Sequence, residues 1–187
     1  MTSIIEHFER FLGPLVQGWR DPNSYTKEPS LMVARFLNVP FSGSSTFATV
    51  GLSDNPLKLL DGRLIRQELI FSVHDVYPAD AVASFLLTFS EFVRSQSRAL
   101  ARGDVIGPSA SLIPDVAASA VYTCPPVIFP TGLDFYTESS PPTIVVWLVP
   151  LVGGEAVAAK KISNNGFEDI FEDKNPDLLD LNRVALV

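Results

Sequence analysis

The side chains that most often carry out covalent chemistry are scarce in this sequence. It contains one cysteine, Cys124, and two histidines, His7 and His74. A thiol nucleophile needs an imidazole to take its proton, so Cys124, His74 and an aspartate are the elements of a thiol hydrolase. Cys124 nevertheless precedes two prolines, without a helix N-terminus that would lower the pKa of its thiol. We therefore interpret Cys124 as a buried structural thiol and expect no catalytic residue.

Other motifs of catalytic and ligand-binding sites are missing as well. The sequence has no GxSxG motif of serine hydrolases and neither GxxxxGK[ST] nor GxGxxG, the loops that bind phosphate. One cysteine and two histidines are too few for a structural zinc site of the usual kind. A single cysteine also excludes an internal disulfide, which is typical of a reducing cytoplasm. We expect no metal, no cofactor and a cytoplasmic location.

Charge is the property that most restricts the choice of partner. The net charge of −7 argues against a nucleic-acid binder, which needs a basic face. Six acidic residues are concentrated near the C-terminus and are opposed by Lys174 alone: Glu168, Asp169, Glu172, Asp173, Asp177 and Asp180. Such an acidic run usually forms a solvated surface, but it can also dock a basic protein by charge complementarity, which salt weakens.

The sequence predicts two strands with a turn between them. Phe47 and Thr49, and then Leu69, Phe71 and Val73, are spaced by two, as in strands that bury one face. The intervening sequence GLSDNP favours a turn. Residues 31–39 read as another strand, which we expect to form an antiparallel hairpin with the first.

Further helices and strands follow from the spacing of apolar residues. We expect a helix over residues 3–13, capped by Ser3 and with His7 exposed. A long helix begins after Pro78 and carries three arginines toward its C-terminal end, before Gly103. Other expected elements are a central strand over 143–151, a short helix over 155–161, a turn at 164–166, a short helix bearing Phe167, Ile170 and Phe171, and a final strand over 182–187.

Together these elements predict an α+β fold with a central mixed, largely antiparallel sheet flanked by helices. We expect a single domain over residues 1–187, with its core over about 31–187. No stretch approaches about 18 uninterrupted apolar residues, so no membrane span is expected. Charged residues within the first 13 positions also argue against a secretory signal.

Five short motifs occur in an order that is informative as a set. They are Gly51-Leu-Ser53, QELIF around Glu68, Gly103-Asp104-Val-Ile, Val149-Pro-Leu followed by Glu155, and Asp180-Leu-Asn-Arg183. These are similar to the "YGLS", "ELxF", "GD-I", "VPL…E" and "D…R" segments of one family. Over about residues 36–183 the chain resembles the Suppressor of Fused domain in its compact bacterial form.

The resemblance implies a mixed α+β domain and a protein-binding function. The animal member binds and restrains a transcription factor by capturing a peptide from it, and bacterial members are generally proposed to be immunity proteins that neutralise toxins. None is an established enzyme. Few residues follow Arg183, and Val105 stands where the animal protein has a histidine, so the transcription-factor role is not expected here.

The polar residues of these motifs have two interpretations. In the structural one, Asp104 caps a turn and Glu68 pairs with an arginine in the core, because buried charges usually persist only when paired. In the functional one, they form a polar surface that binds a partner protein. The residues predicted to bind the partner are Ser53, Glu68, Asp104, Glu155, Glu168, Asp169, Glu172, Asp173 and Arg183.

Our hypothesis is a non-enzymatic, cytoplasmic immunity protein that neutralises a basic toxin domain such as a nuclease. One alternative is a small-molecule enzyme that uses Glu68, Asp104 or Glu155 as acid or base, which a cavity holding two of these carboxylates would favour. The other is a structural module that forms a homodimer through the edge of its sheet.

Overall fold

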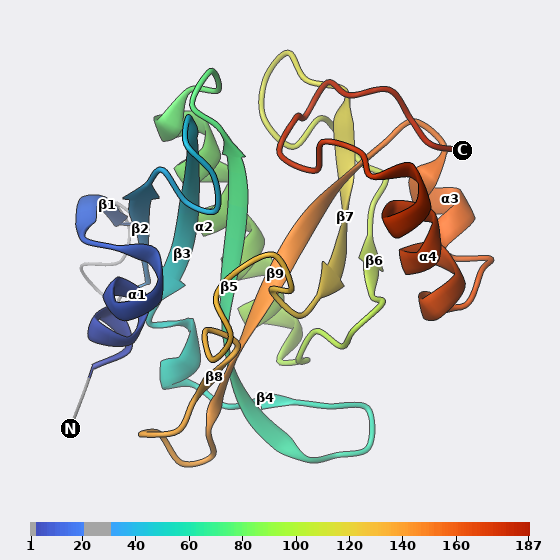
Figure 1. Ribbon diagram of the computed structural model, residues 1–187. Helices are drawn as coiled ribbons and strands as arrows, with labels where there is room; N and C mark the ends of the chain where they lie inside the picture. The colour runs from blue at the N-terminus through green and yellow to red at the C-terminus, as the bar shows by residue number, and fades with distance from the viewer. Residues whose placement is uncertain (1–2, 21–30) are drawn as a thin grey trace.

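A nine-stranded sheet forms the middle of the computed structural model, which describes residues 3–20 and 31–187 (Figure 1). The order across the sheet is β1-β2-β3-β5-β9-β7-β6, with β4 beside β5 and β8 beside β9. Only the pairing of β5 with β9 is parallel among the described strands, which confirms the predicted mixed, largely antiparallel sheet. The strands are β1 (Leu15–Arg20), β2 (Met32–Leu37), β3 (Ser44–Val50), β4 (Leu57–Lys58), β5 (Leu64–His74), β6 (Val105–Ile106), β7 (Ala118–Cys124), β8 (Phe135–Tyr136) and β9 (Thr143–Val152).

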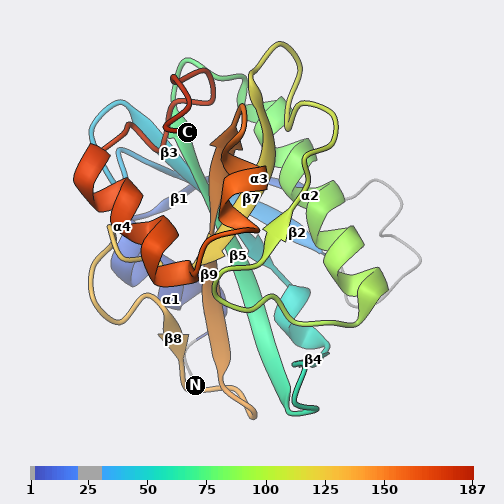
Figure 2. The ribbon, with the colours of Figure 1, turned by 90° about the vertical axis from the view of Figure 1, so that its right-hand side faces the viewer.

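Helices cover both faces of the sheet, and two apolar cores separate them from it. Helix α2 covers one face, where Phe47, Phe71 and Leu86 are buried together. The other helices lie against the opposite face with Trp147 and Phe167 in the second core (Figures 1 and 2). The helices are α1 (Ile4–Leu12), α2 (Ala79–Gln96), α3 (Glu155–Ala159) and α4 (Asn164–Lys174), and a short 3₁₀ turn η2 covers Leu52–Asp54.

Strands β5 and β9, at the centre of the sheet, carry apolar side chains on both faces. Strand β9 is buried over almost its whole length, as expected for a strand covered on both faces. In β5, Leu69 and Phe71 face the core under α2, whereas Ile70 faces the opposite core. The predicted antiparallel hairpin of β2 and β3 is also present.

Helix α1 begins where the sequence predicts, but the side chain of His7 is not placed as predicted. The Ser3 hydroxyl accepts from the Glu6 amide and the Glu6 side chain accepts from the Ser3 amide, which is a capping box. His7 was predicted to be exposed, and this is wrong. His7 is only 6% exposed, and its Nε2 lies 3.0 Å from the carbonyl oxygen of Leu133. Leu133 lies in a distant loop, so this contact could not be predicted from the sequence of the helix.

Helix α2 ends earlier than its arginines suggest. It stops at Gln96, and Ser97 adopts a left-handed conformation with φ +50°. Lys58 of β4 then pairs through its backbone with Ser97 and Ala99, which takes these residues out of the helix. Arg98 and Arg102 therefore lie in a loop over residues 97–104, and their predicted place on the helix is wrong.

The C-terminal part also departs from the predicted elements. Residues 164–166, predicted as a turn, form the start of α4, because the Ser163 hydroxyl accepts from the Gly166 amide and caps the helix. Residues 182–187 form no strand, and β1 was not predicted. The prolines at positions 22 and 29 predict a loop over residues 20–30, which lies outside the described residues except Arg20, which ends β1. Among the helices that the structure describes, none is long and apolar enough to cross a membrane.

Candidate functional site

The residues predicted to bind a partner lie in four separate places. Ser53 and Glu68 meet beside η2, and Glu155 meets Arg183 near the C-terminus. Asp104 lies in the 97–104 loop. The remaining four, from Glu168 to Asp173, are on α4. The structure thus does not bring the nine residues into one cleft.

Glu68 is a buried carboxylate that holds the turn after β3. Its Oε1 accepts from the Gly51 amide at 3.0 Å, the Ser53 amide at 3.0 Å and the Ser53 hydroxyl at 2.6 Å, while Oε2 accepts from the Thr49 hydroxyl at 2.5 Å. Burial raises the pKa of Glu68 to about 7, although these hydrogen bonds favour the anion. The predicted arginine partner is wrong, since hydroxyl and amide donors occupy both oxygens. Arg66 instead donates to the Ser53 and Asp54 carbonyls.

Glu155 and Arg183 form a buried ion pair. Arg183 NH1 lies 2.5 Å from Glu155 Oε1, and NH2 lies 2.7 Å from Oε2 and 3.0 Å from the Pro150 carbonyl. The amides of Val152 and Leu186 also donate to Glu155. Glu155 is 0% and Arg183 8% exposed, so these contacts fasten the C-terminal segment to the end of β9 and do not face a partner.

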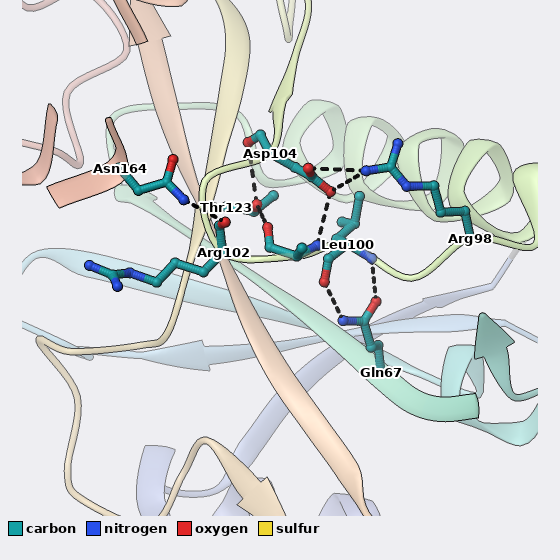
Figure 3. Close-up of polar contacts among 8 residues, drawn as sticks. Gln67, Arg98, Leu100, Arg102, Asp104, Thr123 and Asn164 are labelled. Atoms are coloured by element: carbon teal, nitrogen blue, oxygen red, sulfur yellow. Dashed lines mark hydrogen bonds and ion pairs between the residues drawn. The ribbon is translucent and has the colours of Figure 1, made fainter. Parts of the chain in front are cut away.

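Strands β5 and β7 both form hydrogen bonds with the backbone of the 97–104 loop (Figure 3). Gln67 of β5 donates to the Leu100 carbonyl and accepts from the Leu100 amide, at 2.7 and 2.8 Å. Thr123 of β7 donates to the Ala101 carbonyl. Asp104 accepts from the Ala101 amide at 2.9 Å, so it closes the turn as the structural interpretation expects. These bonds fix the loop against the sheet.

Gly103 lets this loop approach α4. Its φ is +87°, and a Cβ built there would lie 2.2 Å from the side chain of Asn164, which donates to the Arg102 carbonyl (Figure 3). We expect Gly103→Ala to lower the free energy of unfolding by about 1–3 kcal/mol, measured by urea denaturation. Gly62→Ala is the matched control, because Gly62 has φ +88° but its nearest neighbour is Lys58 Cε at 3.9 Å. An equal loss in both variants would contradict a role for the close contact with Asn164.

One predicted residue, Glu168, lies in a charged cluster that connects the loop to α4. Arg102 donates to both of its carboxylate oxygens, with Nε 3.0 Å from Oε1, and the Tyr122 hydroxyl donates to Oε1 at 2.8 Å. The hydrogen bond from Arg102 is the main reason that the pKa of Glu168 lies below its ordinary value. Burial and the hydrogen bond to Glu168 raise the pKa of the Tyr122 phenol. Glu168 is therefore a fixed anion.

This cluster borders a cavity of about 470 Å³ between α4 and the face of β7 and β9 that is turned toward α4. We call this cavity the α4 groove. Its walls are mostly apolar, and the indole Nε1 of Trp147 is buried with no hydrogen-bond acceptor in the described part of the chain. The lining residues are Arg102, Tyr122, Cys124, Pro125, Val127, Ile128, Trp147, Val149, Glu168, Phe171, Glu172, Asn175, Pro176 and Leu178.

The outer side of the groove is strongly acidic. Residues 164–180 contain six of the 21 acidic residues and one of the 14 basic ones, so they carry −5 of the net charge of −7. Glu172 lines the groove, and Asp169 and Asp173 are exposed beside it on α4. The groove thus places an apolar wall beside a row of carboxylates.

Cys124 lines the groove, but its thiol is not activated. Burial, and to a lesser extent the charge of Glu168, raise its pKa to about 12. Since alkylation requires the thiolate, we expect iodoacetamide to modify the folded protein at pH 8 roughly a thousandfold more slowly than the urea-unfolded protein. A folded rate within tenfold of the unfolded rate would contradict the environment described for Cys124.

The groove residues that the sequence did not single out are Arg102, Tyr122 and Trp147. Arg102 precedes the Gly-Asp motif, but it was predicted to lie on the long helix, so its contact with α4 was not expected. Tyr122 and Trp147 read only as strand residues. Among the described residues, no group of three or more His, Cys, Asp or Glu side chains is placed to hold a metal ion.

Comparisons with known proteins show what this architecture is similar to. The family model "Suppressor of fused protein (SUFU)" matches residues 27–184. The immunity protein YqcF of Bacillus subtilis (strain 168) is 22% identical over 176 residues, which cover 93% of this chain and 89% of that protein.

Three solved structures share the fold. A SUFU homologue from Neisseria gonorrhoeae FA 1090 superposes with a TM-score of 0.77 at 14% identity, covering 98% of this chain and 94% of that one. The Sufu–Fu complex superposes with a TM-score of 0.68 at 14% identity, covering 98% of this chain and 90% of that one. Drosophila Suppressor of Fused superposes with a TM-score of 0.64 at 15% identity, covering 98% of this chain and 50% of that one.

Proposed function

Because the chain belongs to the Suppressor of fused protein family, we propose that it is a non-catalytic protein-binding protein that neutralises a toxin. Two comparisons support this proposal. A distant relative is an immunity protein, and one structural neighbour was solved as a complex of Sufu with Fu. We further propose a cytoplasmic location, where an immunity protein would meet its toxin.

The observation that carries the proposal is the position of the α4 groove beside the acidic helix. Interfaces between proteins combine an apolar centre with a polar rim, and opposite charges on the rim speed the encounter. Here the apolar wall is provided by the sheet, and the rim by Glu172, Asp169 and Asp173. A basic toxin domain is the partner whose charge fits this rim.

Of the predicted binding residues, we propose that the four on α4 contact the partner. Glu172, Asp169 and Asp173 are exposed, and Glu168 lines the groove. Ser53, Glu68, Glu155 and Arg183 are buried and contribute by holding the fold. Asp104 contributes by shaping the loop that carries Arg102.

The enzymatic alternative lacks the arrangement that would favour it. Glu68 and Glu155 are both 0% exposed and share no hydrogen-bond partner in the described part of the chain. Neither lines the α4 groove. The homodimer alternative remains a prediction that a sedimentation measurement tests.

A protection assay tests the proposed function. Bacteria that express a toxin encoded next to this chain are expected to survive when the wild-type protein is co-produced. The double variant Glu172→Lys/Asp173→Lys is expected to lose protection and to bind the toxin at least about tenfold more weakly, because the rim charge is reversed. Cations near the C-terminal end of α4 also suit the helix dipole, so the fold should be retained.

Asp54→Lys/Glu138→Lys is the matched control, since it makes the same change in net charge at two exposed residues that do not line the groove. It is expected to protect like the wild type. If the wild type neutralises no neighbouring toxin, or if both double variants protect equally, the proposal is wrong.

A further inference from the structure

We infer that the α4 groove holds a bulky apolar side chain of the partner, carried on a basic segment. This inference rests on the proposed protein-binding function and specifies the chemistry of the segment that is bound.

The groove is large and apolar enough to admit a bulky anchoring side chain. Its volume of about 470 Å³ lies within the range of cavities that hold small molecules, which is more than one side chain needs. Trp147 and Val149 of β9, Phe171 of α4 and Leu178 are among the apolar residues that line it. In protein interfaces, the residues that dominate affinity are bulky side chains that fill such pockets and lose their water.

Trp147 contributes apolar surface to the groove. The residue lines the groove and is 2% exposed. Its Nε1 is buried and has no hydrogen-bond partner in the described part of the chain, so a segment bound in the groove does not reach this donor.

The charges around the groove select a basic segment. Arg102 lines the groove, but Glu168 and Asn165 engage its guanidinium. Glu172 also lines the groove, and no ion pair is found for it among the described residues. With Glu172 in the lining and Asp169 and Asp173 exposed on the same helix, arginine or lysine on either side of the anchor is attracted and an acidic segment is repelled.

The sequence allows a direct optical test, because the protein has two tryptophans. Trp19→Phe leaves Trp147 as the reporter of the groove. The probe is a synthetic peptide with a central phenylalanine flanked by two arginines on each side. It is expected to change the Trp147 emission in a saturable manner that weakens with salt. Replacing its phenylalanine by alanine, or its arginines by glutamates, should weaken binding at least tenfold.

Two variants show whether the groove is the site. Val127→Lys introduces a positive charge at a groove residue that is 75% exposed, and should weaken binding of the basic peptide at least tenfold. Leu60→Lys is the control, at a residue that is 82% exposed and outside the groove lining, and should leave binding unchanged. Because both residues are exposed, neither change removes core packing.

Several results would overturn the inference. These are no effect of the peptide on Trp147, equal binding of the three peptides, equal binding of the single amino acid derivative N-acetylphenylalanine amide, or a dimer in sedimentation that Val127→Lys dissociates. If the peptide fails while Glu172→Lys/Asp173→Lys still abolishes protection, the inference is wrong and the proposed function stands. If the wild type protects against no toxin, the proposed function itself fails.

Discussion

Replacing Arg183 by methionine is expected to lower the free energy of unfolding by about 3–5 kcal/mol. The substitution keeps much of the apolar volume but leaves Glu155, which is 0% exposed, without its cation. It also removes the donor to the Pro150 carbonyl. Chemical denaturation monitored by circular dichroism measures the loss.

Arg63→Met is the matched control for this prediction. Arg63 pairs with Asp61 at 2.7 Å, but the two side chains are 76% and 52% exposed. Exposed pairs contribute at most about 1 kcal/mol, so this variant should remain close to the wild type. Similar losses in both variants would mean that burial of the Glu155–Arg183 pair is not what makes it necessary.

The second large effect concerns the pH dependence of stability, which we expect Glu68 to dominate. Its pKa is about 7 in the folded protein against an ordinary value of 4.5, so between these values the folded state binds the proton and the unfolded state does not. Stability is therefore full below about pH 4.5, falls as the pH rises toward 7, and is then constant, with a total loss on the order of 3 kcal/mol.

Glu68→Gln removes this titration while keeping an oxygen for the amides of Gly51 and Ser53. The difference in unfolding free energy between wild type and variant should change by about 3 kcal/mol, in favour of the variant, from pH 4.5 to pH 7.5. A difference that stays constant over this range would show that the folded and unfolded pKa values of Glu68 are alike.

Local patterns in the sequence were sufficient for strands β2, β3, β5 and β9 and for the ends of α1. The apolar run of β9 reflects burial on both faces. The alternation in β3 and β5 predicted one buried face, and this is wrong, because side chains on both faces of these strands are buried. The end of α2 was not predictable in this way, because it depends on the backbone of Lys58 pairing with Ser97 and Ala99. His7 was misjudged for the same reason, since its partner Leu133 is 126 residues away.

The candidate site was predicted only in part. The acidic run was visible as composition, but only Asp169, Glu172 and Asp173 of it are exposed on α4, whereas Glu168 pairs with Arg102. The family motifs suggested a shared polar site, but Glu68 and Glu155 serve separate local networks within the fold. The α4 groove itself arises from contacts between Arg102, Tyr122 and Glu168, which lie up to 66 positions apart. No local pattern encodes such contacts.

Hydrogen–deuterium exchange of the protein alone and with its toxin tests most directly whether the α4 groove is the binding surface. We predict slower exchange over residues 122–128 and 164–178 in the complex, with no change in the β4–β5 hairpin. Protection confined to the β4–β5 hairpin or to β1, with α4 exchanging as in the free protein, would contradict the proposal that the α4 groove binds the toxin.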